Sequence, residues 1–153
     1  MKTIVVAIDF SPATAAVMAA AATLARVHRG RLVLVHVVQP PIYLPEYGGM
    51  LETIVSIVHQ TEKAGARFLI QWKRALHRRG VAVTTVQADG HPATEILQQA
   101  RSRRAALIVL GSHGHSAGSD LMAGSTACGV LKRAPCPVVV VPAHSLSRTP
   151  ART

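Results

Sequence analysis

A glycine-rich segment in the last third of the chain has the composition of an anion-binding loop. Gly111 and Gly114 are followed, after nine residues, by Gly124, Ser125 and Thr126. Glycines at this spacing permit a tight turn with inward backbone N–H groups, and a helix that begins at Ser125 presents further N–H groups without intrahelical partners. With the two hydroxyls, these groups suit a phosphate chain. The spacing matches neither the P-loop nor the dinucleotide-binding glycine motif, and a glycine-rich turn without a ligand is the alternative.

Asp9 is the second candidate, because it directly follows the apolar run Thr3–Ile8. If that run is a strand of a parallel sheet, Asp9 stands at the carboxyl edge, where open α/β sheets bind ligands. We therefore expect Asp9 to contact the ligand, or to support a divalent ion near the phosphates. The alternative is a cap for the helix that begins near Pro12.

The same segment offers little for catalysis. No Lys or Arg occurs between Gly111 and Leu131, so backbone N–H groups, the helix dipole and a candidate Mg²⁺ ion would balance the phosphate charge. His113 and His115 could add charge if protonated, and His115 is included among the candidate binding residues. Two histidines are too few for a structural zinc, so no metal site is predicted. No catalytic residue is predicted either: a bound phosphate compound would be held, or hydrolysed slowly, as a regulatory signal.

Five apolar runs separated by helical patterns indicate the elements that position these groups. The expected strands cover residues 3–8, 31–38, 81–86, 105–110 and 137–141, and the expected helices cover about 12–28, 50–79, 92–101 and 125–133. Ser11 is expected to cap the first helix and Pro12 to open it. Apolar strands that alternate with helices are typical of a parallel sheet covered on both faces. The predicted fold class is therefore α/β, Rossmann-like, with five parallel strands in one domain.

The composition limits the class of protein. With 49% hydrophobic and 16% charged residues, the chain is too apolar to be intrinsically disordered. No segment has the length of a signal sequence or a transmembrane helix, so we expect a cytoplasmic protein with no membrane partner. Cys128 and Cys136 fit neither a disulfide framework nor a zinc pattern.

The chain carries a net charge of +10, and ten of its 17 basic residues lie near the ends of the expected helices. Cations at these ends complement the helix dipole, which is the interpretation we favour. The alternative is a basic surface for an acidic partner. No aromatic interleaving or recognition motif supports nucleic acid as that partner.

The last apolar run is short and is bounded by Pro137 and Pro142. If it is an edge strand, its unpaired backbone groups could pair with a second copy, which predicts a homodimer. A strand protected within the monomer is the alternative. The predicted interface consists of Val138, Val139, Val140 and Val141.

Several segments resemble the universal stress protein family. They are Asp9 after the first strand, the end of the second strand at 35–38, LIVLGSHG at 107–114, and GST-x-x-x-VLKRAPCPVVVVP at 124–142. The family's nucleotide signature, Gly-x2-Gly-x9-Gly-(Ser/Thr), is met by Gly111, Gly114, Gly124 and Ser125. The resemblance covers almost the whole chain. It implies one domain over residues 1–143, followed by a basic tail over 144–153 that we expect to be disordered.

The resemblance assigns candidate roles by position. Ala7 and Asp9 would line the adenosine end, and Val37 would contact the adenine through its backbone. Leu110 and Gly111 would pass under the ribose. The phosphates would be held by Gly114, Gly124, Ser125 and Thr126. Ala127 stands where many members carry a hydroxyl residue, which could remove one phosphate contact.

The resemblance also implies what the protein does. The expected function is ATP binding, with AMP and cyclic AMP as alternative ligands, in a nucleotide-dependent regulatory module of the stress response. The expected partners are a second copy of the chain, bound through the last strand, and an unidentified regulatory protein. The rival functions are a nucleotide-free dimerising module of the same fold, a slow ATPase and a basic nucleic-acid binder.

Overall fold

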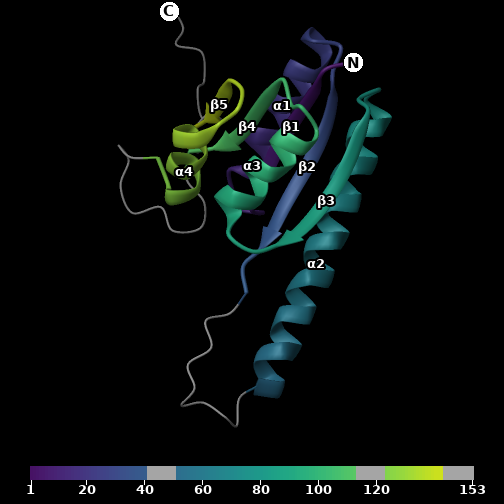
Figure 1. Ribbon diagram of the computed structural model, residues 1–153. Coiled ribbons are helices and arrows are strands. Elements are labelled where there is room, and N and C mark those ends of the chain that lie inside the picture. Colours follow the sequence, from purple (N-terminus) through teal and green to yellow (C-terminus); the bar gives the residue numbers. More distant parts are fainter. Residues whose placement is uncertain (41–50, 113–122, 143–153) are drawn as a thin grey trace, which may run out of the picture.

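A five-stranded parallel sheet with helices on both faces forms the framework of the structure (Figure 1). The computed structural model describes residues 1–40, 51–112 and 123–142, and the statements below concern those residues. The elements are β1 (Thr3–Ile8), α1 (Thr14–Val27), β2 (Arg31–Val38), α2 (Leu51–Arg78), β3 (Val83–Asp89), α3 (Pro92–Ser102), β4 (Leu107–Gly111), α4 (Ser125–Arg133) and β5 (Val138–Val141). The Rossmann-like α/β prediction is confirmed. The expected basic tail, 144–153, lies outside the described residues.

The strands lie in the order β3-β2-β1-β4-β5, and each neighbouring pair is parallel. The chain moves outward from β1 through β2 to β3, and then returns to the other side of β1 with β4 and β5. The order therefore reverses between β1 and β4. At such a reversal the following helices leave on opposite faces, and a crevice opens at the carboxyl ends of the two strands.

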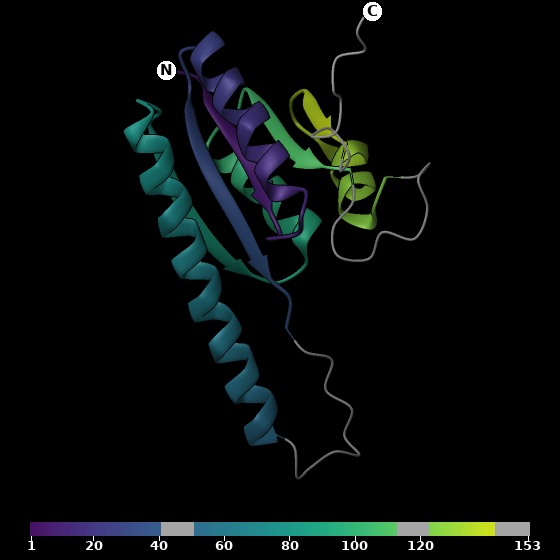
Figure 2. The same cartoon turned by 180° about the vertical axis from the view of Figure 1, so that it is seen from behind.

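Side chains that alternate along the strands are buried in two separate hydrophobic cores, one on each face of the sheet. Ile4 and Val6 of β1 belong to a cluster that packs against α1 and α2, whereas Val5 belongs to a cluster that packs against α3 and α4. Figures 1 and 2 show these helix pairs on opposite faces of the sheet. Val5, Val6, Leu32 and Ile108 are fully buried, which explains why the strands read as continuous apolar runs.

The start of α1 differs from the prediction. The helix begins at Thr14 after Ala13, and no side chain caps it. Ser11 uses its carbonyl oxygen, which accepts the N–H of Thr14 at 3.0 Å, while its own N–H donates to the Asp9 carboxylate at 3.0 Å. The left-handed turn at Phe10 (φ 57°) directs the chain this way. The prediction that Ser11 caps the first helix is therefore wrong.

Two strands are displaced from their predicted ranges. β3 extends from Val83 to Asp89, and its last residue pairs with Val38 of β2. It is an edge strand, so polar residues continue the pairing after the apolar run has ended. β4 begins at Leu107, because Ala106 only donates its N–H to Thr3 at 2.8 Å before the regular pairing starts.

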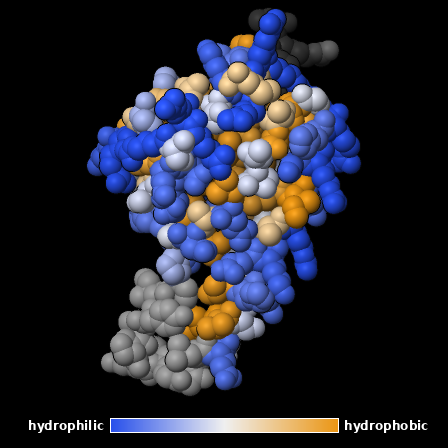
Figure 3. All heavy atoms as spheres, turned by 45° about the vertical axis from the view of Figure 1, so that its right-hand side comes forward, coloured by the Kyte–Doolittle hydropathy of each residue, from blue (hydrophilic) through white to orange (hydrophobic). Residues whose placement is uncertain are grey.

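The apolar stripe of α2 is only half covered. Gly65, Leu69 and Leu76, in its second half, pack on the sheet, whereas Val55 in the first half is 56% exposed. Figure 1 shows the first turns of α2 extending beyond the sheet. Figure 3 shows apolar side chains at the surface in this lower part of the molecule.

Gly129 marks a close approach of α4 to α3. A Cβ at this position would lie 2.9 Å from the Cβ of Ala93, which is fully buried. Alanine normally stabilises a helix by about 1 kcal/mol over glycine, but overpacking of this size costs about 1–3 kcal/mol. We expect Gly129→Ala to lower the free energy of unfolding in urea. An Ala93→Gly/Gly129→Ala double variant should be more stable than additivity predicts; strict additivity would contradict the contact.

Candidate functional site

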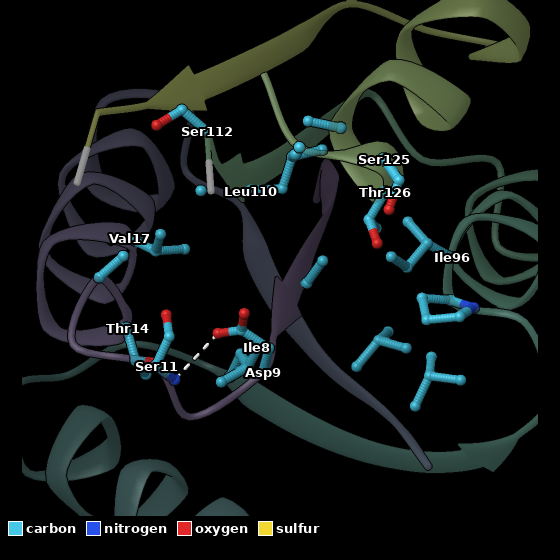
Figure 4. Close-up of a pocket in the computed structure, with 18 of the residues that line it drawn as sticks. Ile8, Asp9, Ser11, Thr14, Val17, Ile96, Leu110, Ser112, Ser125 and Thr126 are labelled. Carbon is cyan, nitrogen blue, oxygen red and sulfur yellow. Dashed lines mark hydrogen bonds between the residues drawn. The ribbon is translucent and has the colours of Figure 1, made fainter. Parts of the chain in front are cut away.

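A cavity of about 250 Å³ opens at the carboxyl ends of β1 and β4, at the reversal of strand order (Figure 4). Its floor is formed by the ends of β1, β2 and β4, and its walls by the first residues of α1, α3 and α4. The lining residues are Ala7, Ile8, Asp9, Ser11, Ala13, Thr14, Val17, Val35, Val37, Gln39, Pro92, Ile96, Leu110, Gly111, Ser112, Gly124, Ser125, Thr126 and Ala127.

Most of the candidate binding residues gather around this one cavity. Those that line it are Ala7, Asp9, Val37, Leu110, Gly111, Gly124, Ser125 and Thr126. They come from four elements that are distant in the sequence, and the parallel topology brings their ends to one edge. Gly114, His113 and His115 lie outside the described residues.

The wall at α4 is the start of a helix without a side-chain cap. Gly124 is the N-cap residue, with an extended backbone (φ −61°, ψ 166°), and its N–H donates to the carbonyl oxygen of Ser112 at 2.6 Å. The next N–H groups, at Ser125 and Thr126, have no partner within the helix by the geometry of helix starts. No acidic residue occupies the first turn, so the positive end of the helix dipole is directed at the cavity without a neutralising carboxylate on the helix itself.

The end of β1 supplies the one carboxylate of the described lining. Asp9 is exposed, and its Oδ1 accepts the N–H of Ser11. The N-cap residue of α1 is Ala13, so this bond lies in the turn that leads into the helix. The carboxylate lines the cavity, and the capping alternative stays a prediction.

The described lining contains no lysine, arginine or histidine. Three helices begin at this edge, at Thr14, Pro92 and Ser125, so their partial charges supply the positive potential. The arginine-rich helix ends, such as Arg26 and Arg133, belong to the opposite edge. The cavity therefore suits an anion held by backbone dipoles.

Sequence reasoning missed two polar groups of the lining. Ser11 and Thr14 are only 6% and 7% exposed, and neither side-chain oxygen has a hydrogen-bond partner among the residues that the structure describes. Ser11 was interpreted as a cap, and Thr14 was not singled out within the expected helix at about 12–28. A signal was available, because Thr14 shares a helix face with the buried Val17 and Ala21.

The apolar part of the cavity lies toward α3. It is formed by Val35, Val37, Pro92 and Ile96, which give an aliphatic lining beside the polar α4 wall. A ligand with an apolar ring and an anionic tail matches this division. Ala127 is 1% exposed and lines the polar wall, where its side chain offers no hydroxyl.

No group of three or more His, Cys, Asp or Glu residues that could hold a metal occurs in 1–40, 51–112 and 123–142. Cys136 is partly buried, and this burial raises the pKa of its thiol. None of the helices in those ranges has the length and hydropathy needed to cross a membrane.

Fold and site together define an α/β protein with a ligand cavity at the switch point of a Rossmann-like sheet. Comparison with known proteins narrows this class. The model of the universal stress protein family matches residues 1–142, and the chain belongs to this family.

Individual relatives agree with that assignment. Universal stress protein YxiE of Bacillus subtilis is 33% identical over 146 residues, covering 89% of this chain and 95% of YxiE. Among solved structures, universal stress protein UspA from Lactobacillus plantarum superposes with a TM-score of 0.81 at 24% identity, covering 92% of this chain and 97% of UspA. A family member from Burkholderia pseudomallei gives a TM-score of 0.70 at 29% identity, with 92% and 96% covered.

Proposed function

We propose that this universal stress protein binds ATP in the cavity between β1 and β4 and acts as a nucleotide-dependent regulatory module. The observation that carries the proposal is the gathering of Asp9, Gly111 and the Gly124–Thr126 segment around one cavity. Adenine would occupy the aliphatic side formed by Val35, Val37 and Ile96. The phosphates would lie at the start of α4, with Gly114 and His115 as further proposed contacts.

Two related structures support an adenine nucleotide as the ligand class. A universal stress protein from Archaeoglobus fulgidus, with a TM-score of 0.62 at 22% identity, is a complex with dAMP. Another universal stress protein, with a TM-score of 0.64 at 19% identity, is a complex with cAMP. Our choice of ATP rests on the glycine signature and on the uncapped start of α4.

A holding role fits the site better than rapid catalysis. Efficient phosphoryl transfer uses a cation on the γ-phosphate and a residue that orients the nucleophile. The described lining offers neither a lysine nor an arginine, and Asp9 is its one ionisable side chain. Bound Mg²⁺ would neutralise part of the phosphate charge, and Asp9 is the residue that would support it.

The proposal is tested by titrating the purified protein with ATP and with GTP in a calorimeter. We expect ATP to bind at least about tenfold more tightly than GTP, because the adenine would bind Val37 through the backbone. Phosphate release should stay below about one turnover per minute, compared with 1–100 s⁻¹ for typical kinases. Equal affinity for the two nucleotides, or turnover that Ser125→Ala abolishes, would contradict this function.

A further inference from the structure

The α1 side of the cavity carries two buried hydroxyls that the proposed adenosine and phosphate contacts leave unused. Ser11 Oγ and Thr14 Oγ1 have no hydrogen-bond partner within the described structure, and both residues are more than nine-tenths buried. A buried hydroxyl without a partner costs free energy. Both residues line the ligand cavity, so a ligand atom can supply the missing partner.

The same wall is the start of a helix. α1 has 14 residues, its N-cap residue Ala13 offers no capping side chain, and no acidic residue stands in its first turn. The positive end of its dipole therefore lies beside the two hydroxyls without a neutralising carboxylate on the helix itself. Hydroxyl donors at a helix N-terminus are suited to a phosphate oxygen.

This wall faces the proposed phosphate site across the crevice. α1 follows β1 and α4 follows β4, and these strands are neighbours with Val6 paired to Val109. In Figure 4, Ser11 and Thr14 lie on one side of the cavity, and Ser125 and Thr126 lie on the other. Two helix N-termini from opposite faces of the sheet thus border one cavity.

We propose that Ser11 and Thr14 bind the terminal phosphoryl group of a nucleoside triphosphate whose inner phosphates lie at the start of α4. This inference rests on the proposed function. A monophosphate needs only the α4 wall. A triphosphate carries more charge over a longer chain, and the described lining has no lysine or arginine to meet it. The second helix N-terminus adds positive potential there, and the Mg²⁺ that Asp9 would support offsets the carboxylate bonded to the Ser11 N–H, so the cavity selects ATP over AMP.

The test compares ATP and AMP binding by calorimetry for the wild type, Ser11→Ala, Thr14→Val and the double variant. Thr23→Val is the matched control, because Thr23 lies on α1 and its exposed hydroxyl donates to the carbonyl oxygen of Ala19 at 3.0 Å. We expect the double variant to bind ATP at least about tenfold more weakly, because hydrogen bonds to a charged group are lost. AMP affinity should change by less than about twofold.

Thermal unfolding of the ligand-free variants distinguishes a phosphate-binding role of the two hydroxyls from a role in stabilising the fold. Removing unpaired buried hydroxyls should leave the Tm unchanged or raise it. Equal losses of ATP and AMP affinity, unchanged ATP affinity, or a lower ligand-free Tm would each overturn the inference. If the wild type binds both nucleotides and the variants lose no more affinity for ATP than for AMP, only this inference is contradicted. If the folded wild type binds neither, the proposed function falls with it.

Discussion

Replacing Gly124 with valine is expected to reduce the affinity for ATP on the order of 100-fold. Gly124 is the N-cap residue of α4, and its backbone angles (φ −61°, ψ 166°) are readily adopted by valine. The variant should therefore fold. The new side chain would occupy the space where we place a phosphate, so the loss would come from steric exclusion. Isothermal titration with Mg-ATP measures the change directly.

A graded series sharpens this prediction. Gly124→Ala adds one carbon and should lose less affinity than Gly124→Val. The control is Ala106→Val, because Ala106 is exposed and lies before β4 at the opposite edge of the sheet. The control should bind ATP as the wild type does. Wild-type affinity in a folded Gly124→Val variant would contradict the assignment of the phosphates to the start of α4.

The second large effect concerns the proposed homodimer. We expect Val140→Pro to convert the dimer to a monomer without unfolding it. The N–H of Ile108 donates to the carbonyl oxygen of Pro137, and that of Ser112 donates to Val141. Because backbone groups alternate in direction along a strand, the N–H of Val140 points away from β4 toward the open edge. Proline removes this donor and blocks antiparallel pairing with a second copy.

Val139→Pro provides the matched control for that experiment. By the same alternation, the backbone N–H and C=O of Val139 face β4. Proline at this position should therefore break the hydrogen bonding between β4 and β5 and lower the Tm. Light scattering after gel filtration distinguishes the two variants. A wild type that is monomeric at micromolar concentration, or a Val140→Pro variant that remains dimeric, would rule out the β5 interface.

The sheet was predictable because its strands are buried on both faces. The run at 3–8 and the run at 31–38 agree with β1 and β2 residue for residue, since β-branched residues fill both cores. The prediction failed where tertiary contacts decide the boundary. The last residues of β3 are polar yet paired, and the start of α1 depends on the left-handed turn at Phe10, which no local pattern signals.

The candidate site was predictable to the extent that it lies at strand ends. Asp9 and Gly111 follow apolar runs, and parallel topology brings such ends to one edge. The Ser11 and Thr14 hydroxyls were missed because what marks them is the lack of a hydrogen-bond partner in the described structure. Whether a buried hydroxyl finds a hydrogen-bond partner depends on residues of other elements, and the sequence alone does not predict which residues those are.

Thermal unfolding of the wild type with and without about 1 mM Mg-ATP tests the central claim most directly. At a concentration of 100 times the Kd, ATP would stabilise the folded state by about 2.7 kcal/mol, a rise in Tm on the order of 5–10 °C for a chain of this size. Absorbance at 260 nm first establishes that the sample carries no nucleotide from purification. The account predicts a clear upward shift; an unchanged Tm in a folded, nucleotide-free sample would contradict it.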